Sequence, residues 1–145
     1  MNNEKSYIDR QSVKNLGEDL FEQYCREKDY WFQRIGFDEK LNNVPHFYEL
    51  NPLLRNLPDY LVYRDDDLML VNVKGTPNIK KEEMALLPWL AENYASKKVT
   101  LYYAFCFKDE KPRVFPYWKV IEMFEKENDK KWHDGKVYRT LGGLK

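Results

Sequence analysis

The chain has 145 residues, of which 43% are hydrophobic and 33% are charged. This composition is typical of a folded globular protein and excludes a disordered chain. Basic and acidic residues number 24 each, so the formal net charge is zero. A zero net charge counts against tight unaided binding to nucleic acid, because such binding depends on neutralising phosphates. The length is that of one ordinary domain, and we expect a single domain over residues 1–145.

Cysteine usage and hydropathy predict a reduced, membrane-free location. Cys25 and Cys106 lie far apart in the sequence and form no disulfide framework, so we expect a cytoplasmic protein. Both should be buried, unreactive thiols, since one falls in a predicted helix and the other in an apolar strand. No apolar run approaches the length of a membrane span. His46 and His133 are too few for a zinc site of histidine and cysteine ligands.

The first predicted element is a helix over residues 12–29. Ser12 is a good N-cap, and the apolar residues that follow recur at helical spacing. Glu18 falls at the edge of the apolar face rather than at its centre. The predicted face is made of Val13, Leu16, Leu20, Phe21 and Tyr24.

An aromatic strand and an irregular segment follow this helix. Residues 30–37 are rich in aromatic side chains and should form a strand that Gly36 ends. Residues 38–58 contain three prolines and should be irregular. Asn51 followed by Pro52 is an N-cap and N1 pair, which predicts a short helical turn over residues 51–56.

The middle of the chain predicts a hairpin and a second helix. Residues 59–63 and 68–74 are strands on either side of an acidic turn, residues 64–67. Residues 78–97 have the apolar stripe of a helix. Pro88 either kinks this helix or stands in the first turn of a shorter one.

The C-terminal part predicts two more strands, a third helix and a hairpin. Residues 99–107 are strongly apolar and should be a central strand. Pro116 places the strand over residues 113–118 at an edge or at its own end. Residues 118–128 should be helical, and Asp134-Gly135 favours a tight turn within residues 131–141. The fold class is therefore α/β or α+β, with helices covering a mixed sheet.

Three polar residues should meet at the open end of the central hairpin. Alternation places Asn72 and Lys74 on one face of their strand, and hairpin pairing brings Asp59 beside them. A simple reading is that the strand reaches solvent there, where Gly75 ends it. The acidic turn lies at the opposite end of the hairpin and should be a solvated loop.

The combination of these features resembles a known enzyme family. Pro58-Asp59, a strand, a turn and a second strand ending in Val73-Lys74-Gly75 resemble the PD-(D/E)xK nuclease superfamily. "LGEDLFEQY", which contains Glu18, resembles the opening helix of that family, and the order of elements agrees. The resemblance covers residues 12–107 and implies a restriction-endonuclease-like core of one helix, three strands, a helix and a strand. Residues 108–145 would be a C-terminal extension.

The resemblance implies a function and a role for each site residue. The protein would be a metal-dependent endonuclease that hydrolyses phosphodiester bonds of DNA, with Mg²⁺ or Mn²⁺ as cofactor. Asp59, Glu18, the residue at position 72 and the backbone carbonyl of Val73 would hold the metal. Lys74 would hold the attacking water and offset charge in the transition state. Weaker candidates for phosphate binding are Lys80 and Lys81, at the start of the second helix.

Position 72 departs from the family pattern, which has an acid where this chain has Asn72. A neutral amide oxygen is a weaker metal ligand than a carboxylate, although the family includes active members with an amide here. Two functions stay open: a DNA nuclease, or a catalytically degenerate module on the same fold that binds nucleic acid or a protein partner. A third is a subunit that needs a partner, or a second copy in a homodimer, to engage DNA.

Overall fold

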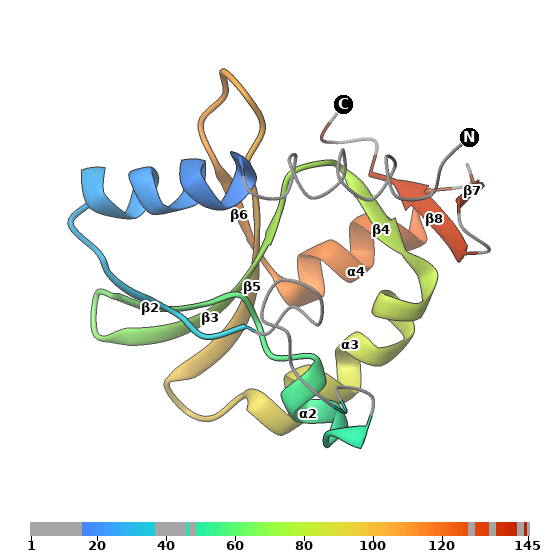
Figure 1. Cartoon of the computed structure of the whole chain (residues 1–145), viewed down its shortest axis with the longest axis horizontal. Coiled ribbons are helices and arrows are strands. Elements are labelled where there is room, and N and C mark those ends of the chain that lie inside the picture. Colours follow the sequence, from blue (N-terminus) through green and yellow to red (C-terminus); the bar gives the residue numbers. More distant parts are fainter. Residues whose placement is uncertain are drawn as a thin grey trace.

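The computed structural model describes residues 16–36, 46, 49–127, 130–133, 136–141 and 144. Its main feature is a five-stranded sheet in the order β1-β2-β3-β5-β6 (Figure 1). Only β3 and β5 run parallel, and the other neighbours are antiparallel. The strands are β1 (Trp31–Arg34), β2 (Tyr60–Arg64), β3 (Asp67–Lys74), β5 (Val99–Phe105) and β6 (Arg113–Pro116). The predicted mixed sheet is confirmed, with β5 inside it and the proline-ended β6 at its edge.

Helices cover both faces of this sheet. Residues 16–27 are helical and lie on one side, and α3 (Lys81–Tyr94) and α4 (Tyr117–Glu125) lie on the other (Figure 1). Helix α3 connects the parallel strands β3 and β5, which a two-residue turn could not join. The predicted short helical turn is α2 (Pro52–Arg55), where the Asn51 side chain accepts a hydrogen bond from the Leu53 amide at 2.9 Å.

Alternation along β3 divides the core into two clusters. Met69, Val71 and Val73 face the N-terminal helix, whereas Leu70 packs toward α3 and α4. The first cluster consists of Phe21, Cys25, Tyr60, Val62, Met69, Val71, Val73, Ala104 and Cys106. The second consists of Ile79, Met84, Leu87, Ala91, Leu101, Tyr103, Phe105, Val120, Phe124, Leu141 and Leu144. Both cysteines are free and buried, as predicted.

The predicted apolar face of the N-terminal helix is confirmed in part, because Phe21 lies in the first core cluster and Leu20 and Tyr24 pack against it. Leu16, expected on the apolar face, is 42% exposed, whereas Glu18, expected at its edge, is 2% exposed. Gly17 and Glu18 face the sheet, because Gly17 comes close to the strand backbone there and Glu18 forms an ion pair. Hydrophobic periodicity was therefore wrong about Leu16 and underestimated the burial of Glu18. Ser12 and Val13 lie outside the described residues.

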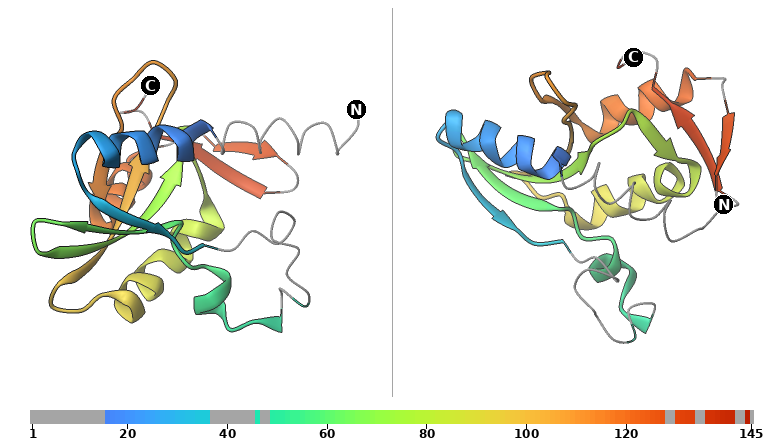
Figure 2. Two further views of the ribbon diagram at one scale, coloured as in Figure 1. Left: turned by 60° about the vertical axis from the view of Figure 1, so that its left-hand side comes forward. Right: turned by 45° about the horizontal axis from the view of Figure 1, so that its top comes forward.

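The predicted second helix begins later than its sequence pattern indicated. Residues Asn78–Lys80 form strand β4, which pairs with β8 (Lys136–Thr140) in a three-stranded sheet β4-β8-β7. Strand β7 is Lys130–His133, so the predicted C-terminal hairpin strands are confirmed, although the Asp134-Gly135 turn lies outside the described residues. Figure 2 shows this small sheet beside α3 and α4, away from the described N-terminal helix. Strands β4 and β8 are separated by about half the chain, and the local hydrophobic periodicity of either segment gives no sign that the two will pair.

Two backbone features follow from particular residues. Asp65 and Asp66 have positive φ values of 48° and 70°, which suit a tight turn of the type that matches strand twist, and they confirm the predicted hairpin. Pro88 lies in the interior of α3, so the alternative that placed it in a first turn is wrong. Among the residues described, no helix has the length and apolar character needed to cross a membrane.

Candidate functional site

Asp59 is fixed at the open end of the β2–β3 hairpin. Its Oδ2 accepts a hydrogen bond from the Val73 amide at 2.8 Å, and its backbone carbonyl accepts one from the Ile35 amide at 3.0 Å. A Cβ on Gly36 would lie 3.0 Å from the Pro58 carbonyl oxygen and 3.4 Å from Asp59 Oδ1. The chain after β1 therefore passes so close to Asp59 that glycine fits best there. These contacts hold the carboxylate beside the end of β3.

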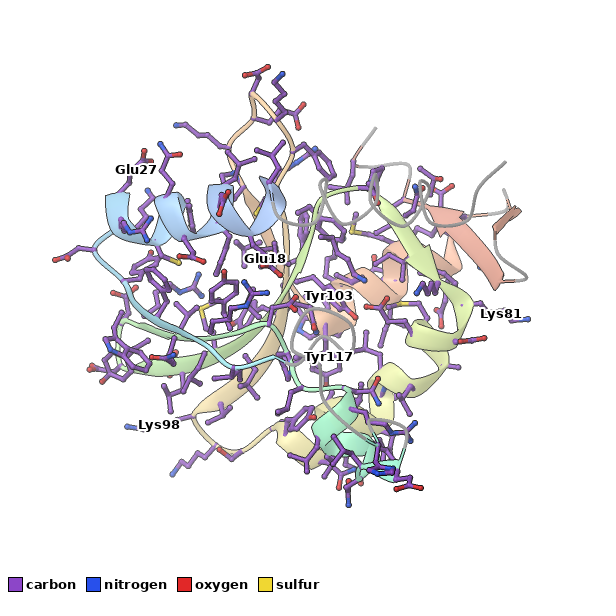
Figure 3. All side chains as sticks on the ribbon, viewed as in Figure 1. Glu18, Glu27, Lys81, Lys98, Tyr103 and Tyr117 are labelled. Atoms are coloured by element: carbon purple, nitrogen blue, oxygen red, sulfur yellow. The ribbon has the colours of Figure 1, made fainter. Side chains whose placement is uncertain are left out.

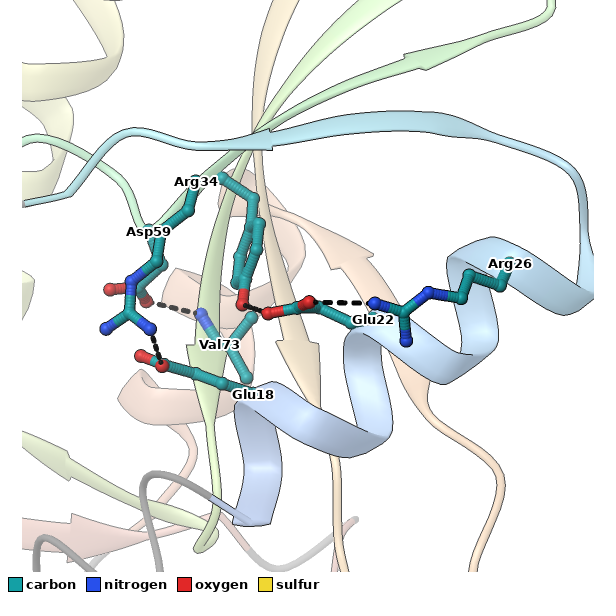
Figure 4. A network of polar contacts seen from close by, with 7 residues as sticks. Glu18, Glu22, Arg26, Arg34, Asp59 and Val73 are labelled. Carbon is teal, nitrogen blue, oxygen red and sulfur yellow. Dashed lines mark hydrogen bonds and ion pairs between the residues drawn. The ribbon is translucent and has the colours of Figure 1, made fainter.

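Glu18 reaches the same place from the N-terminal helix. Its side chain is 3% exposed, and Oε2 forms an ion pair with the guanidinium of Arg34 at 2.8 Å. Figure 4 marks this ion pair and the hydrogen bond between the Val73 amide and Asp59. The ion pair ties a buried acid of the N-terminal helix to the edge strand β1.

A glycine contact allows the helix to approach this closely. A Cβ on Gly17 would lie 3.2 Å from the Cα of Gly75 and 3.5 Å from the carbonyl oxygen of Cys106. The first of these distances is tighter than most Cβ contacts, so a residue without a side chain lets the helix backbone come close to that of the strand here. Because Gly75 follows Lys74 directly, the contact places Glu18 beside the end of β3.

A second contact anchors the helix to β2 one turn further on. The Tyr60 hydroxyl donates a hydrogen bond to Glu22 Oε2, and Glu22 pairs with Arg26 at 3.3 Å (Figure 4). Burial and the Glu22 carboxylate raise the pKa of Tyr60, so the phenol stays protonated and keeps donating. The helix is therefore attached to the strands that carry Arg34 and Asp59.

Lys74 takes part in a network on the opposite face of the sheet. Its Nζ lies 2.8 Å from Glu83 Oε2, in the first turn of α3, and the Tyr103 hydroxyl donates to Glu83 Oε1 at 2.7 Å. The ammonium also lies 6.0 Å from the centre of the Tyr103 ring. These contacts hold the Lys74 side chain on the α3 side of β3.

Burial and charge set the protonation states in this network. Burial alone would raise the pKa of Glu83, but the Lys74 ammonium and hydrogen bonds from Lys74 and Tyr103 outweigh it and lower that pKa. Burial, then the charge of Glu83 and its hydrogen bond, raises the pKa of Tyr103 well above its usual range, and the charge of Asp59 adds to this rise. Glu83 is therefore ionised and Tyr103 protonated at neutral pH.

Asn72 lies between these groups along β3. It is partly exposed, and its Cα stands opposite Tyr103 of β5. It shares its face of the strand with Lys74. Of the four predicted site residues, Asn72 and Lys74 therefore lie on the α3 side of β3, Glu18 belongs to the helix on the other side, and Asp59 is hydrogen-bonded to the β3 backbone at Val73. Side chains labelled in Figure 3 show Glu18 and Tyr103 in the interior and Lys81 at the outer surface, away from Glu18.

Arg34 and Glu83 are site residues that sequence reasoning missed. Arg34 is the last residue of a four-residue edge strand, and Glu83 belongs to a charged run that resembles an ordinary solvated helix start. Neither position carries a motif. A signal for Glu83 would have required knowing that α3 begins directly over the β3–β5 pair.

The donor set at this site is made of oxygen atoms. Across the described ranges, no group of three or more histidine, cysteine, aspartate or glutamate residues could hold a metal ion. Mg²⁺ does not require such a group, because it commonly binds through one or two carboxylates and keeps several waters. Glu18 pairs with the Arg34 guanidinium, and Asp59 accepts a hydrogen bond from the Val73 amide. Carboxylate oxygens of this kind are the ligands that a hard divalent cation prefers.

Comparison with known proteins agrees on the fold. No protein-family model matches the chain, and no curated protein matches its sequence. Among solved structures, the fold is similar to that of Hjc, a Holliday junction resolvase from the archaeal hyperthermophile Archaeoglobus fulgidus. The TM-score is 0.53 and the identity 13%, over 90% of this chain and 88% of the resolvase. The chain therefore has a nuclease-like fold with a central mixed sheet flanked by helices.

Proposed function

We propose that the protein is a metal-dependent nuclease that hydrolyses phosphodiester bonds of DNA. The observation that carries the proposal is the hydrogen bond from the Val73 amide to Asp59, at 2.8 Å. This hydrogen bond holds the Asp59 carboxylate beside Val73, the residue before Lys74 at the end of β3. The chain also has a fold similar to that of a DNA resolvase. The buried Glu18 at the same point gives a second acid.

Each residue has a stated task in this proposal. Asp59 and Glu18 would hold Mg²⁺ or Mn²⁺, with the Asn72 amide oxygen and the Val73 carbonyl as neutral donors. The bound ion would polarise the phosphate and lower the pKa of its water. The Lys74 ammonium would hydrogen-bond the attacking water and offset charge on the phosphate in the transition state. Lys80 and Lys81 remain weaker candidates for contacts with neighbouring phosphates.

The substrate we propose is DNA with a branch or a bend. The resolvase with the similar fold is named for a four-way junction, and this chain has zero net charge. Weak general attraction to phosphates favours a substrate whose shape adds contacts, or a second subunit that adds basic surface. A homodimer or a partner protein would supply that surface.

Cleavage assays test this function. Plasmid, linear duplex and four-way-junction DNA are incubated with Mg²⁺ or Mn²⁺ and the wild-type protein, Asp59→Ala, Lys74→Ala or the control Lys98→Ala, at an exposed position. We expect cleavage by the wild type and Lys98→Ala, and a loss of at least about a hundredfold in the two site variants, since preorganised charge is worth that much. Absence of cleavage on every substrate, or equal cleavage by all four proteins, would rule the proposal out.

A second function is favoured by one observation. Arg34 already neutralises Glu18, and Asn72 removes one negative charge from the family pattern. Such a site could serve a non-catalytic module that binds nucleic acid or a protein. Calorimetric titration with Mn²⁺ separates the two, because a structural ion pair predicts no binding and the nuclease predicts binding that Asp59→Ala abolishes.

A further inference from the structure

Strand β1 is an edge of the five-stranded sheet that lacks the usual protection of an edge (Figure 2). Three of its four residues are exposed, and it contains neither proline nor lysine. The opposite edge, β6, is only partly exposed, ends in Pro116 and leads directly into α4. Within the residues that the structure describes, β1 pairs with β2 alone. Because an exposed edge offers its backbone to another chain, β1 is the edge to which a further strand can be added.

The backbone groups of β1 alternate between β2 and the outer side. The Ile35 amide donates to the Asp59 carbonyl at 3.0 Å, in the same register as the β1–β2 pairs. Every second residue back along β1 therefore also bonds toward β2. The residues between them, Phe32 and Arg34, point their amides and carbonyls away from the sheet.

Two neighbouring backbone groups already have partners. The Tyr30 amide donates to the Cys25 carbonyl at 2.8 Å, and the Arg34 carbonyl accepts a hydrogen bond from the Gln33 side chain at 3.2 Å. An added strand should therefore match the amides of Phe32 and Arg34 and the carbonyl of Phe32.

We propose that the added strand is β1 of a second copy of this chain, antiparallel to the first and with Phe32 on the two-fold axis. In this register the two Phe32 residues exchange both backbone hydrogen bonds, and each Arg34 amide faces the Tyr30 carbonyl of the other copy. The Tyr30 amide and the Arg34 carbonyl stand opposite each other, and both keep the partners that they already have. The inference does not depend on the proposed nuclease function.

The side chains of β1 complement themselves in this register. Residues opposite each other in an antiparallel pair are neighbours on one face of the sheet, where aromatic pairs are favourable. Phe32 meets its own copy, and Arg34, the only charged residue of β1, meets Tyr30, whose ring attracts a guanidinium. On the other face Trp31, which is 55% exposed, meets Gln33. This self-complementarity favours a second copy over an unrelated strand.

The proposed interface adjoins the candidate site through Arg34. The backbone of Arg34 lies in the proposed ladder between the two copies, whereas its guanidinium forms the ion pair with Glu18 at 2.8 Å. Pairing of the two edges would therefore also fix the residue that holds Glu18.

Sedimentation equilibrium tests the inference with a charge exchange at exposed positions. The acidic variant carries Trp31→Glu and Gln33→Glu, and the basic variant carries Trp31→Lys and Gln33→Lys. Each variant alone places like charges opposite each other and should dimerise at least about tenfold more weakly than the wild type. An equimolar mixture of the two variants places opposite charges together and should recover most of the loss. Trp118→Glu, at a tryptophan of α4 that is 57% exposed, should match the wild type.

Each possible result supports or overturns the inference. Weaker dimerisation of both charged variants, with recovery in the mixture, supports it, and the recovery also shows that both variants fold. A wild type that stays monomeric up to about 1 mM overturns it. A dimer that the charged variants do not weaken lies elsewhere on the surface. A loss that the mixture does not recover overturns the pairing of Trp31 with Gln33, and with it the register.

Discussion

The two ends of the β2–β3 hairpin both carry aspartate, but their surroundings differ. At the tip, Asp65, Asp66 and Asp67 are exposed, and the first two adopt positive φ values. At the open end, Asp59 accepts a hydrogen bond from the Val73 amide, and the buried Glu18 pairs with Arg34. The difference is in the neighbouring elements, since a helix, the edge strand β1 and α3 converge only on the open end.

This contrast shows what turns an acidic residue into part of a site. The acids at the tip serve the turn, where aspartate tolerates the left-handed conformation. The acids at the open end are held by donors and cations on three elements, so their positions are fixed before any ligand binds. Counting carboxylates along the sequence would have favoured the tip, which has three in a row.

The largest expected difference between the two ends concerns metal binding. Asp59→Asn keeps an acceptor for the Val73 amide and removes the charge, whereas Asp66→Asn removes a charge at the tip. Calorimetry with Mn²⁺ should show a loss of at least about tenfold in affinity for the first variant and none for the second. Equal losses at both ends would mean that general negative charge, not the built site, attracts the cation.

The next difference concerns Arg34, the cation that pairs with Glu18. Arg34→Ala leaves a buried carboxylate without its guanidinium, and we expect a loss of about 3 kcal/mol in the free energy of unfolding. Arg26→Ala removes a pair that is exposed on the helix surface and should cost no more than about 0.5 kcal/mol. Urea denaturation measures both values.

The same Arg34→Ala variant tests whether a metal can replace the guanidinium. A ligand that binds only the folded state raises its stability. Thermal melts in Mn²⁺ and in EDTA should therefore differ more for Arg34→Ala than for the wild type. An equal difference would contradict the idea that the two cations share one place.

A smaller effect is expected at the Lys74 network and depends on pH. Folding lowers the pKa of Glu83, so its charge stabilises the folded protein at pH values above the ordinary carboxyl pKa. This stabilisation is lost as the pH falls through the lowered pKa. Glu83→Gln should cost about 1 kcal/mol at pH 7, with the gap from the wild type closing below about pH 4. Chemical denaturation across pH 3 to 7 reveals the gap. A constant gap would show that Glu83 acts by shape and not by charge.

The smallest effect is expected at the hairpin tip. Asn-Gly is a better fit than Asp-Asp for two consecutive residues with positive φ. Asp65→Asn with Asp66→Gly should therefore stabilise the protein by about 0.5 kcal/mol and leave Mn²⁺ affinity unchanged. A change in metal affinity would show that the two ends of the hairpin are coupled.

Local patterns predicted the hairpin that carries Asp59 and Lys74, because the two segments are joined by a short turn. In the structure the Val73 amide holds Asp59, whereas Lys74 is held on the α3 side of β3 by Glu83. Glu18 was found only through the resemblance of its helix to a known family, because periodicity placed it at the edge of the apolar face rather than in the interior. Its burial depends on Arg34, which an edge strand supplies from outside the hairpin.

The parts that were missed depend on long-range packing. Strand β4 was read as the start of a helix because its partner, β8, is about 60 residues away. That misreading also hid Glu83, whose position over β3 follows from where α3 begins. The charged run from Lys80 to Glu83 gives no local sign of which member turns inward.

The contact between Gly17 and Gly75 also bears on how freely the rest of the core can change. Side-chain volumes in the first core cluster do not set the spacing at this point, since the two backbones already touch. Substitutions at Phe21 or Val62 could shift the far end of the helix while its near end stays against the strand. Relatives of this protein could therefore vary widely in their apolar residues and keep the same separation between Glu18 and the end of β3.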